Sequence, residues 1–249
     1  MFDKEKSLRM LEDIKMILDN EKISFWLEAG TLLGAIKYKE IMAWDTDIDL
    51  GAFKKDFPER VQKKLSNLFE NKGFTVYFFP EKIDFIRDGG AAIQVHLAHG
   101  PKKGYFTRQM ADNRHKSGKK LFQIYRLANV SYFGSWRFSL SKKNAKTNLF
   151  KLISYIPKSL KKKMSKRIML KLTNLKESGV YYIKIPQGML KLKNILFYGL
   201  KYAIPTGYES YLSMQYGNWR APPPKGNKPW VWHEHGDWKK VYNPREMMI

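Results

Sequence analysis

Two aspartates separated by one residue, Asp47 and Asp49, are the strongest candidates for catalytic or metal-binding residues in this sequence. They alternate with Ile48 and Leu50, a pattern that predicts a β-strand with both carboxylates on one face and the apolar side chains in the core. Two like charges on one face of a strand are unfavourable. A divalent cation such as Mg²⁺ or Mn²⁺ removes that repulsion and keeps room for substrate phosphates. The pair therefore predicts a metal site, although a lone Asp-x-Asp is more often a solvated strand end.

A glycine-bounded segment, Gly30-Thr31-Leu32-Leu33-Gly34, precedes the aspartates, with 12 residues between Gly34 and Asp47. Glycines let backbone N–H groups approach a phosphate closely, and the N-terminus of the short helix expected here would add its positive end. Either pattern alone is a weak signal. Their joint appearance favours a site that binds a phosphorylated substrate beside a metal ion.

The elements that would position these residues are helices and strands mixed along the chain. Apolar spacing predicts helices over 5–20 and 57–70, and strands over 23–27, from Phe74, and over 82–87 and 91–97 with a turn between the last two. Further along, the pattern predicts a hairpin of runs 121–128 and 130–140 around Asn129, a strand-like run at 195–204, and a short helix capped by Thr206 and ended by Gly217. This mixture predicts an α+β fold.

Positive charge is concentrated in one part of the chain. The net charge is +23, and the 64 residues between Asp112 and Glu177 contain no carboxylate but 18 Lys or Arg. Within this stretch, apolar residues recur at nearly helical spacing from Leu149 to Leu175, with Pro157 starting a second helix or kinking the first. We expect residues 149–175 to dock on an anionic membrane surface, which this stripe suits better than a nucleic-acid groove. The alternative is that the stripe packs on the catalytic core and the lysines face water.

Composition excludes several classes of protein. The chain has no cysteine, which rules out disulfides, cysteine-ligated zinc and thiol nucleophiles. No run of about 18 apolar residues occurs, and the first ten residues have no apolar signal-peptide core. We therefore expect a cytoplasmic protein that is peripheral at the membrane face.

Segment 26–51, WLEAGTLLGAIKYKEIMAWDTDIDLG, resembles the signature of the LicD family, which runs W-L-x-x-G-T-L-L-G, a basic residue, then W-D-x-D-h-D. The version with Glu28 resembles the fukutin-related branch. A second match, AIPTGYESYLSMQYG at 203–217, is similar to the family's closing motif. The resemblance spans roughly residues 20 to 220.

The resemblance implies a nucleotidyltransferase-like mixed sheet flanked by helices, with a basic amphipathic helical insertion. We expect the chain to form a single domain, 1–249, with a core at 1–140, the insertion at 141–178 and a C-terminal part at 179–249. The implied activity is transfer of a phospho-alcohol, such as choline phosphate or ribitol phosphate, from a CDP-linked donor to a hydroxyl of a cell-surface glycan or lipid-linked glycan, releasing CMP. Lipopolysaccharide, capsule or teichoic acid precursors are acceptors of this kind.

Carried over by position, the resemblance assigns roles to individual residues. Asp47 and Asp49 would hold Mg²⁺ or Mn²⁺. The substrate-binding residues would be Gly30, Thr31, Gly34, Lys37 and Asp45, with the donor phosphates at Gly30 and Thr31 and Asp45 supporting the metal site. Lys37 replaces the usual arginine, which keeps the charge but loses bidentate phosphate contact.

The chain departs from the family where a third acidic residue is expected on a later strand. His96, in Val95-His96-Leu97, stands at that position, and Asp84 is the rival acid. His96 could act as a catalytic base or be a packed strand residue. If neither residue serves, the protein would be a weakly active or inactive member that binds a membrane or partner. A nucleotidyltransferase acting on RNA or a small molecule is the other alternative.

The C-terminal part adds two weaker candidates. His233, Glu234 and His235, near Asp237, could be metal ligands or surface packing. The tryptophans from Trp136 onward, with the tyrosines of 203–217, could line a sugar or cytosine pocket or be core aromatics. The three tyrosines of this segment are Tyr208, Tyr211 and Tyr216.

Overall fold

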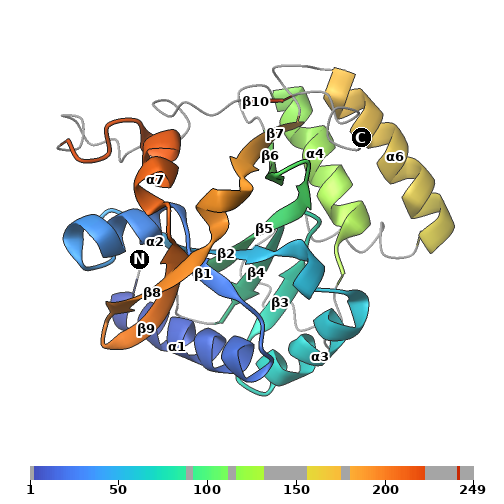
Figure 1. Ribbon diagram of the computed structural model, residues 1–249. Coiled ribbons are helices and arrows are strands. Elements are labelled where there is room, and N and C mark those ends of the chain that lie inside the picture. Colours follow the sequence, from blue (N-terminus) through green and yellow to red (C-terminus); the bar gives the residue numbers. More distant parts are fainter. Residues whose placement is uncertain are drawn as a thin grey trace.

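A mixed β-sheet with helices packed around it forms the body of the protein (Figure 1). The structure is a computed structural model, and it describes residues 3–87, 92–111, 116–131, 156–174, 180–221 and 240–241. The strand order is β1-β2-β5-β6-β7-β10, and β4 pairs with β5 and carries β3 at its other edge. The bounds are β1 Phe25–Leu27, β2 Asp47–Phe53, β3 Thr75–Phe78, β4 Lys82–Ile86, β5 Ala92–Lys102, β6 Tyr105–Ala111, β7 Val180–Pro186 and β10 Lys240–Val241. The predicted α+β fold is confirmed.

Helices cover the sheet from several sides. The two predicted helices near the N-terminus are present as α1 (Lys4–Asn20) and α3 (Glu59–Glu70), and both lie along one side of the sheet. The Asp3 carboxylate caps the N-terminus of α1. The short helix α2 (Ala29–Leu33) runs directly into η1 (Gly34–Tyr38), near α7 (Tyr208–Tyr216). The helices α4 (Lys116–Asn129) and α6 (Lys158–Asn174) pack together on the opposite side (Figure 1). The shorter elements are η2 (Lys54–Asp56), η4 (Gln187–Leu190), β8 (Leu192–Phe197) and β9 (Leu200–Pro205).

The strand that carries the two aspartates lies between β1 and β5. It is antiparallel to β1 and parallel to β5, and its apolar residues Ile48 and Leu50 are fully buried. Gly51 pairs with Trp26 of β1, and a Cβ atom at Gly51 would lie 2.2 Å from the indole ring. The missing side chain therefore lets Trp26 pack flat across the strand and fixes β2 against β1.

Two local predictions are wrong. The run 121–128 is part of α4 and not a strand, because Phe122 and its neighbours one turn apart pack against α6. Most of the second run, 132–140, lies outside the described residues. Thr206 does not cap α7, whose N-cap is Gly207 without a side-chain hydrogen bond, although the helix ends at Gly217 as predicted.

The strand-like run at 195–204 is a hairpin of β8 and β9. Its two-residue turn, Tyr198-Gly199, has positive φ at both positions, 47° and 77°. That geometry matches the type I′ turns that connect twisted antiparallel strands, which explains why glycine occupies the second position.

The basic segment forms a helix that begins directly after Pro157, as predicted. Its apolar stripe does not face outward along its whole length: Ile168 and Leu172 are buried against Phe122 of α4, and Met164 is partly buried in the same cluster. The expectation that the whole stripe docks on a membrane surface is therefore wrong at Ile168 and Leu172, which pack against α4. Residues 149–155 and 175 lie outside the described residues. In the described part of the chain, no helix is long and apolar enough to cross a membrane.

Candidate active site

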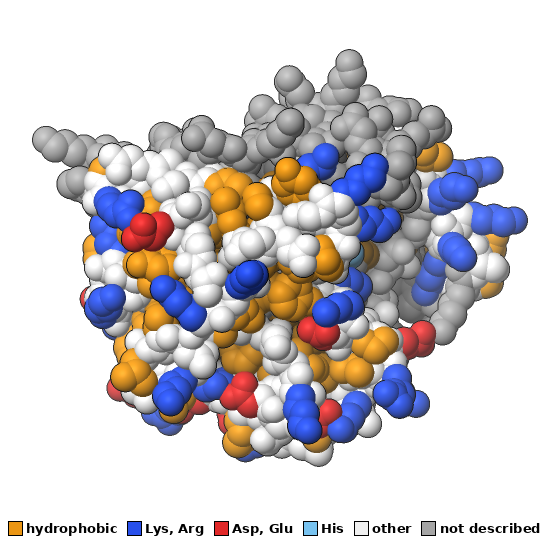
Figure 2. Space-filling view, viewed as in Figure 1, with side chains coloured by type: hydrophobic (Ala, Val, Ile, Leu, Met, Phe, Trp, Pro, Cys, Tyr) orange, Lys and Arg blue, Asp and Glu red, His pale blue; other side chains and the backbone are white. Residues whose placement is uncertain are grey.

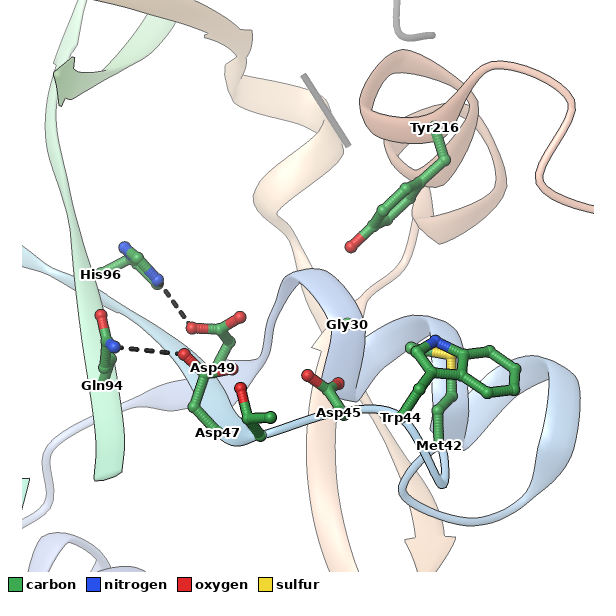
Figure 3. Close-up of a pocket in the computed structure, with 10 residues that line it drawn as sticks. Gly30, Met42, Trp44, Asp45, Asp47, Asp49, Gln94, His96 and Tyr216 are labelled. Carbon is green, nitrogen blue, oxygen red and sulfur yellow. Dashed lines mark hydrogen bonds and ion pairs between the residues drawn. The ribbon is translucent and has the colours of Figure 1, made fainter. Parts of the chain in front are cut away.

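Asp47 and Asp49 face a cavity of about 290 Å³ (Figure 3). Because Ile48 and Leu50 are anchored in the core, strand alternation turns the two carboxylates toward the cavity. The cavity is lined by Gly30, Met42, Trp44, Asp45, Thr46, Asp47, Asp49, Gln94, His96 and Tyr216. The structure thus brings together the aspartates, Gly30 and His96, as the sequence predicted.

Each aspartate of β2 is held by a side chain from β5. The parallel register places Asp49 opposite Gln94 and Gly51 opposite His96. Gln94 Nε2 donates to Asp47 Oδ2 at 3.2 Å, and His96 Nε2 lies 2.9 Å from Asp49 Oδ1. Burial lowers the pKa of His96 well below its usual value, so the ring is neutral and we assign the Nε2 proton as the one donated to Asp49. Both carboxylates are oriented before any ligand binds.

The rival acid Asp84 lies outside the cavity lining. It is opposite Gln94 on the other side of β5, and its Oδ1 is 2.8 Å from the ammonium of Lys82. The sequence left open whether His96 or Asp84 takes the position of the third acidic residue. In the structure, His96 is the one that lies beside Asp49.

Burial makes the cavity aspartates hard to ionise together. It raises the pKa of Asp49 to about 7 and that of Asp47 to about 6, where the Asp49 charge adds to the effect. Burial and the charges of both residues also raise the pKa of Asp45 to about 7. The side chains of Asp45 and Asp47 share a hydrogen bond. A cation between them would favour the ionised forms.

The residues present fit Mg²⁺ or Mn²⁺ bound through two carboxylates. Across the described ranges, no group of three or more His, Cys, Asp or Glu side chains is arranged to hold a metal ion. Mg²⁺ commonly takes one or two carboxylates and completes its shell with water and substrate phosphates. Burial raises the pKa values of Asp47 and Asp49, and a cation bound between the two carboxylates would favour their ionised forms. His233, Glu234, His235 and Asp237 lie outside the described residues.

The glycine-bounded segment supports the site in a different way from the one predicted. Gly30 lines the cavity, and a Cβ atom there would lie 2.5 Å from Asp45 Oδ2, so the glycine makes room for that carboxylate. Thr31 Oγ1 accepts a hydrogen bond from the backbone N–H of Asp49 at 2.9 Å. Gly34 is outside the cavity lining, where a Cβ atom would lie 2.5 Å from the carbonyl oxygen of Glu40. Thr31 and Gly34 therefore shape the backbone around the site.

Lys37 is directed away from the cavity. Its ammonium donates to the carbonyl oxygens of Trp219 and Ala221, at 2.9 Å and 2.5 Å. Lys37 was predicted to be a substrate-binding residue, but in this structure its side chain fastens the segment after α7 to η1.

A buried carboxylate, Glu28, joins the two ends of the signature. It accepts hydrogen bonds from Arg108 of β6 at 2.9 Å and from Tyr211 and Gln215 of α7 at 2.9 Å and 2.7 Å. It also accepts from the Trp26 indole and the Ala29 backbone N–H, so a negative charge already occupies the start of α2. Burial opposes ionisation of Glu28, but the Arg108 charge and these donors outweigh it and lower the pKa. The network fixes α7 beside the aspartates.

Aromatic side chains form part of the cavity wall. Tyr216, on α7, points its hydroxyl toward the aspartates, and burial raises its pKa well above the usual value, so it remains a neutral donor (Figure 3). Tyr211 belongs to the Glu28 network instead, and Tyr208 is partly buried against the core. The partly exposed Trp44 lines the cavity, a role that the sequence had not predicted. Among the tryptophans from Trp136 onward, Trp219 lies in the described part of the chain, and it is buried in the core.

The part of the chain that carries most of this site is similar to a known protein family. Residues 22–127 match the family described as LicD/FKTN/FKRP, nucleotidyltransferase domain. The resemblance predicted from segment 26–51 is therefore confirmed over residues 22–127. The closing motif at 203–217 lies beyond the matched residues, but its contacts with Glu28 connect it to them.

Similar proteins share limited stretches with this chain. The uncharacterized protein RP689 of Rickettsia prowazekii is 33% identical over 70 residues, which are 28% of this chain and 26% of that protein. The ribitol 5-phosphate transferase FKRP of Homo sapiens is 42% identical over 40 residues, 16% of this chain and 8% of that protein. The matched stretches thus span about a quarter or less of these relatives.

Two solved structures, one of an antibiotic-resistance factor and one of an antibiotic adenylyltransferase, are distantly similar. The antibiotic-resistance factor ANT(2'')-Ia gives a TM-score of 0.34 at 11% identity, with 70% of this chain and 96% of that one covered. The lincosamide antibiotic adenylyltransferase LnuA gives a TM-score of 0.33 at 14% identity, with 63% and 100% covered.

Proposed function

We propose that this protein transfers a phospho-alcohol from a CDP-linked donor to a hydroxyl group of a glycan or lipid-linked glycan, releasing CMP, with Mg²⁺ or Mn²⁺ as its cofactor. The observation that carries the proposal is the pair Asp47 and Asp49, which faces a cavity within the segment that matches the LicD family. The printed activity of FKRP, ribitol 5-phosphate transfer, supports ribitol phosphate as the first group to test.

Asp47 and Asp49 would hold the metal ion, which when bound supplies positive charge for the donor diphosphate. The reaction breaks the bond between the transferred phosphorus and the bridging oxygen, which leaves with CMP, and forms a bond to the acceptor oxygen, whose proton is lost. Gly30 leaves space beside Asp45, and the neutral hydroxyl of Tyr216 is placed to donate a hydrogen bond to a bound ligand. Trp44 offers an apolar wall for the donor or acceptor.

His96 is best explained as a positioning residue. Its Nε2 proton is committed to Asp49, so the ring orients a metal-binding carboxylate and takes the place of a third acidic ligand. Gln94 does the same for Asp47. If His96 were instead a catalytic base, His96→Ala and His96→Gln would lose turnover equally.

Purified protein incubated with CDP-ribitol, CDP-choline or CDP-glycerol, each with Mg²⁺ or Mn²⁺ and without metal, tests the proposal by CMP release. We expect metal-dependent release from at least one donor, increased by an acceptor glycan. ATP and CTP serve as controls, because a nucleotidyltransferase would release pyrophosphate from them. Pyrophosphate release without CMP release from any CDP donor would contradict the proposal.

A further inference from the structure

The helices α4 and α6 enclose an apolar groove of about 580 Å³ on the side of the molecule away from α7 (Figure 1). Its lining residues come from both helices and from the residue before Pro157. They are Leu121, Ile156, Leu160, Lys163, Met164, Arg167, Ile168 and Lys171. A pocket of this size with mostly apolar walls and a few polar groups is typical of a small-ligand site.

Two parallel rows of side chains on α6 form the groove. Leu160, Met164 and Ile168 are spaced by four residues, and so are Lys163, Arg167 and Lys171. Residues at this spacing lie one above another on a helix, so a row of cations runs beside a row of apolar side chains. Figure 2 shows Lys and Arg side chains gathered where α6 lies.

The apolar row changes from buried to exposed along the helix. Ile168 is 9% exposed and packs on α4, whereas Leu160 is 54% exposed. The groove therefore opens toward the N-terminal end of α6, where apolar surface meets solvent directly beside the cations.

Nothing described in the structure neutralises the cationic row. Among the described residues, no ion pair joins Lys163, Arg167 or Lys171 to a carboxylate, and the sequence supplies none between Asp112 and Glu177. The groove thus offers positive charge to an anion and apolar surface to a hydrocarbon, side by side. A nucleic acid would use the charge but leave the apolar row exposed.

We propose that this groove binds an anionic phospholipid of a membrane leaflet, with the headgroup phosphate on the cationic row and an acyl chain along the apolar row. The proposal does not rest on the transferase activity. In the sequence-based expectation, the helix lies flat and its whole apolar stripe enters the bilayer. In this proposal, a groove between α4 and α6 holds one lipid.

Vesicle flotation of the full chain tests it, with phosphatidylcholine vesicles compared with vesicles that also contain phosphatidylglycerol. The variant Arg167→Glu/Lys171→Glu reverses two charges inside the groove. Lys162→Glu/Lys166→Glu makes the same change on exposed α6 positions outside the lining and is the matched control. We expect binding to the anionic vesicles alone, a loss of about tenfold or more for the groove variant, and a clearly smaller loss for the control.

Two further measurements separate a lipid site from diffuse attraction. Leu160→Asn should weaken vesicle binding without changing the thermal unfolding midpoint, because Leu160 is largely exposed. Soluble dihexanoyl phosphatidylglycerol should compete, whereas glycerol 3-phosphate, which lacks acyl chains, should not. Equal losses for the two charge variants, no effect of Leu160→Asn, or release by an RNA oligonucleotide but not by the short-chain lipid would each overturn the proposal.

Discussion

The aspartate cavity and the α4/α6 groove are built in opposite ways. In the cavity the charges are negative and partly buried, and Asp47 and Asp49 are each held by one side chain of β5. In the groove the charges are positive and exposed on a surface helix, which a small cluster around Phe122 and Leu172 attaches to α4. The cavity depends on a few atoms in fixed positions, whereas the groove depends on summed charge beside apolar surface.

This difference predicts how the two regions respond to substitution. A buried charge with one partner has no substitute when that partner is lost, so single changes near the cavity have large effects. Exposed cations contribute small and roughly additive amounts.

Glu28→Gln should destabilise the protein most. It leaves the fully buried Arg108 guanidinium without its principal counter-charge, at a cost of about 3–5 kcal/mol in the free energy of unfolding. Urea unfolding measures this. Glu40→Gln is the matched control, because Glu40 forms an ion pair with Lys4 in which both side chains are largely exposed, and it should cost about 0–1 kcal/mol. Similar losses for both variants would remove the distinction between a buried network and surface charge.

His96→Ala should lower turnover about 10–100-fold, because the hydrogen bond that orients Asp49 is lost. His96→Gln keeps an N–H donor on a side chain of similar reach and should restore much of the activity, with an unchanged pH profile. A catalytic base would behave differently, since both variants would lose turnover equally. Steady-state CMP release across pH, with melting temperatures as a check on folding, separates the two roles.

Asp49→Asn should stabilise the metal-free protein in a pH-dependent way. The pKa of Asp49 rises from 3.8 to about 7 on folding, so the folded state binds more protons than the unfolded state between these values. The metal-free wild type therefore loses stability from Asp49 as pH rises through this window. The variant should be close to wild type at pH 4 and more stable by a few kcal/mol at pH 8, because each pKa unit of the difference corresponds to about 1.4 kcal/mol. Denaturant unfolding with a chelator present tests this, and a difference that shrinks as pH rises would contradict it.

Arg167→Ala, in the groove, should change folding stability by no more than about 0.5 kcal/mol, because its exposed side chain lies outside the buried cluster. Its effect should appear in lipid binding instead. A large loss of stability at this position would show that the cationic row holds α6 in place.

The sequence predicts the aspartate pair well because the evidence is local. Alternation with Ile48 and Leu50 determines which way Asp47 and Asp49 face without reference to the rest of the chain. Gln94 was missed because its role depends on the register between β2 and β5, although its alternation with His96 in an apolar strand was a usable signal.

Other residues could not be placed without the tertiary structure. Arg108 and Lys37 find their partners across the fold, at Glu28 and at the backbone of 219–221. The run 121–128 was interpreted as a strand because a short apolar run has no clear period. The stripe at 149–175 had the correct period, but periodicity does not show whether α4 or a lipid covers it.

Mn²⁺ binding, followed by electron paramagnetic resonance in the presence of CDP, tests whether Asp47 and Asp49 hold the metal ion. Wild type, Asp49→Asn and Asp84→Asn are compared, the last as a control that removes a nearby carboxylate paired with Lys82. We predict Mn²⁺ binding to wild type and to Asp84→Asn with similar affinity, and binding at least about tenfold weaker to Asp49→Asn. Equal Mn²⁺ binding by Asp49→Asn and wild type would contradict the assignment of the β2 aspartates as the metal site.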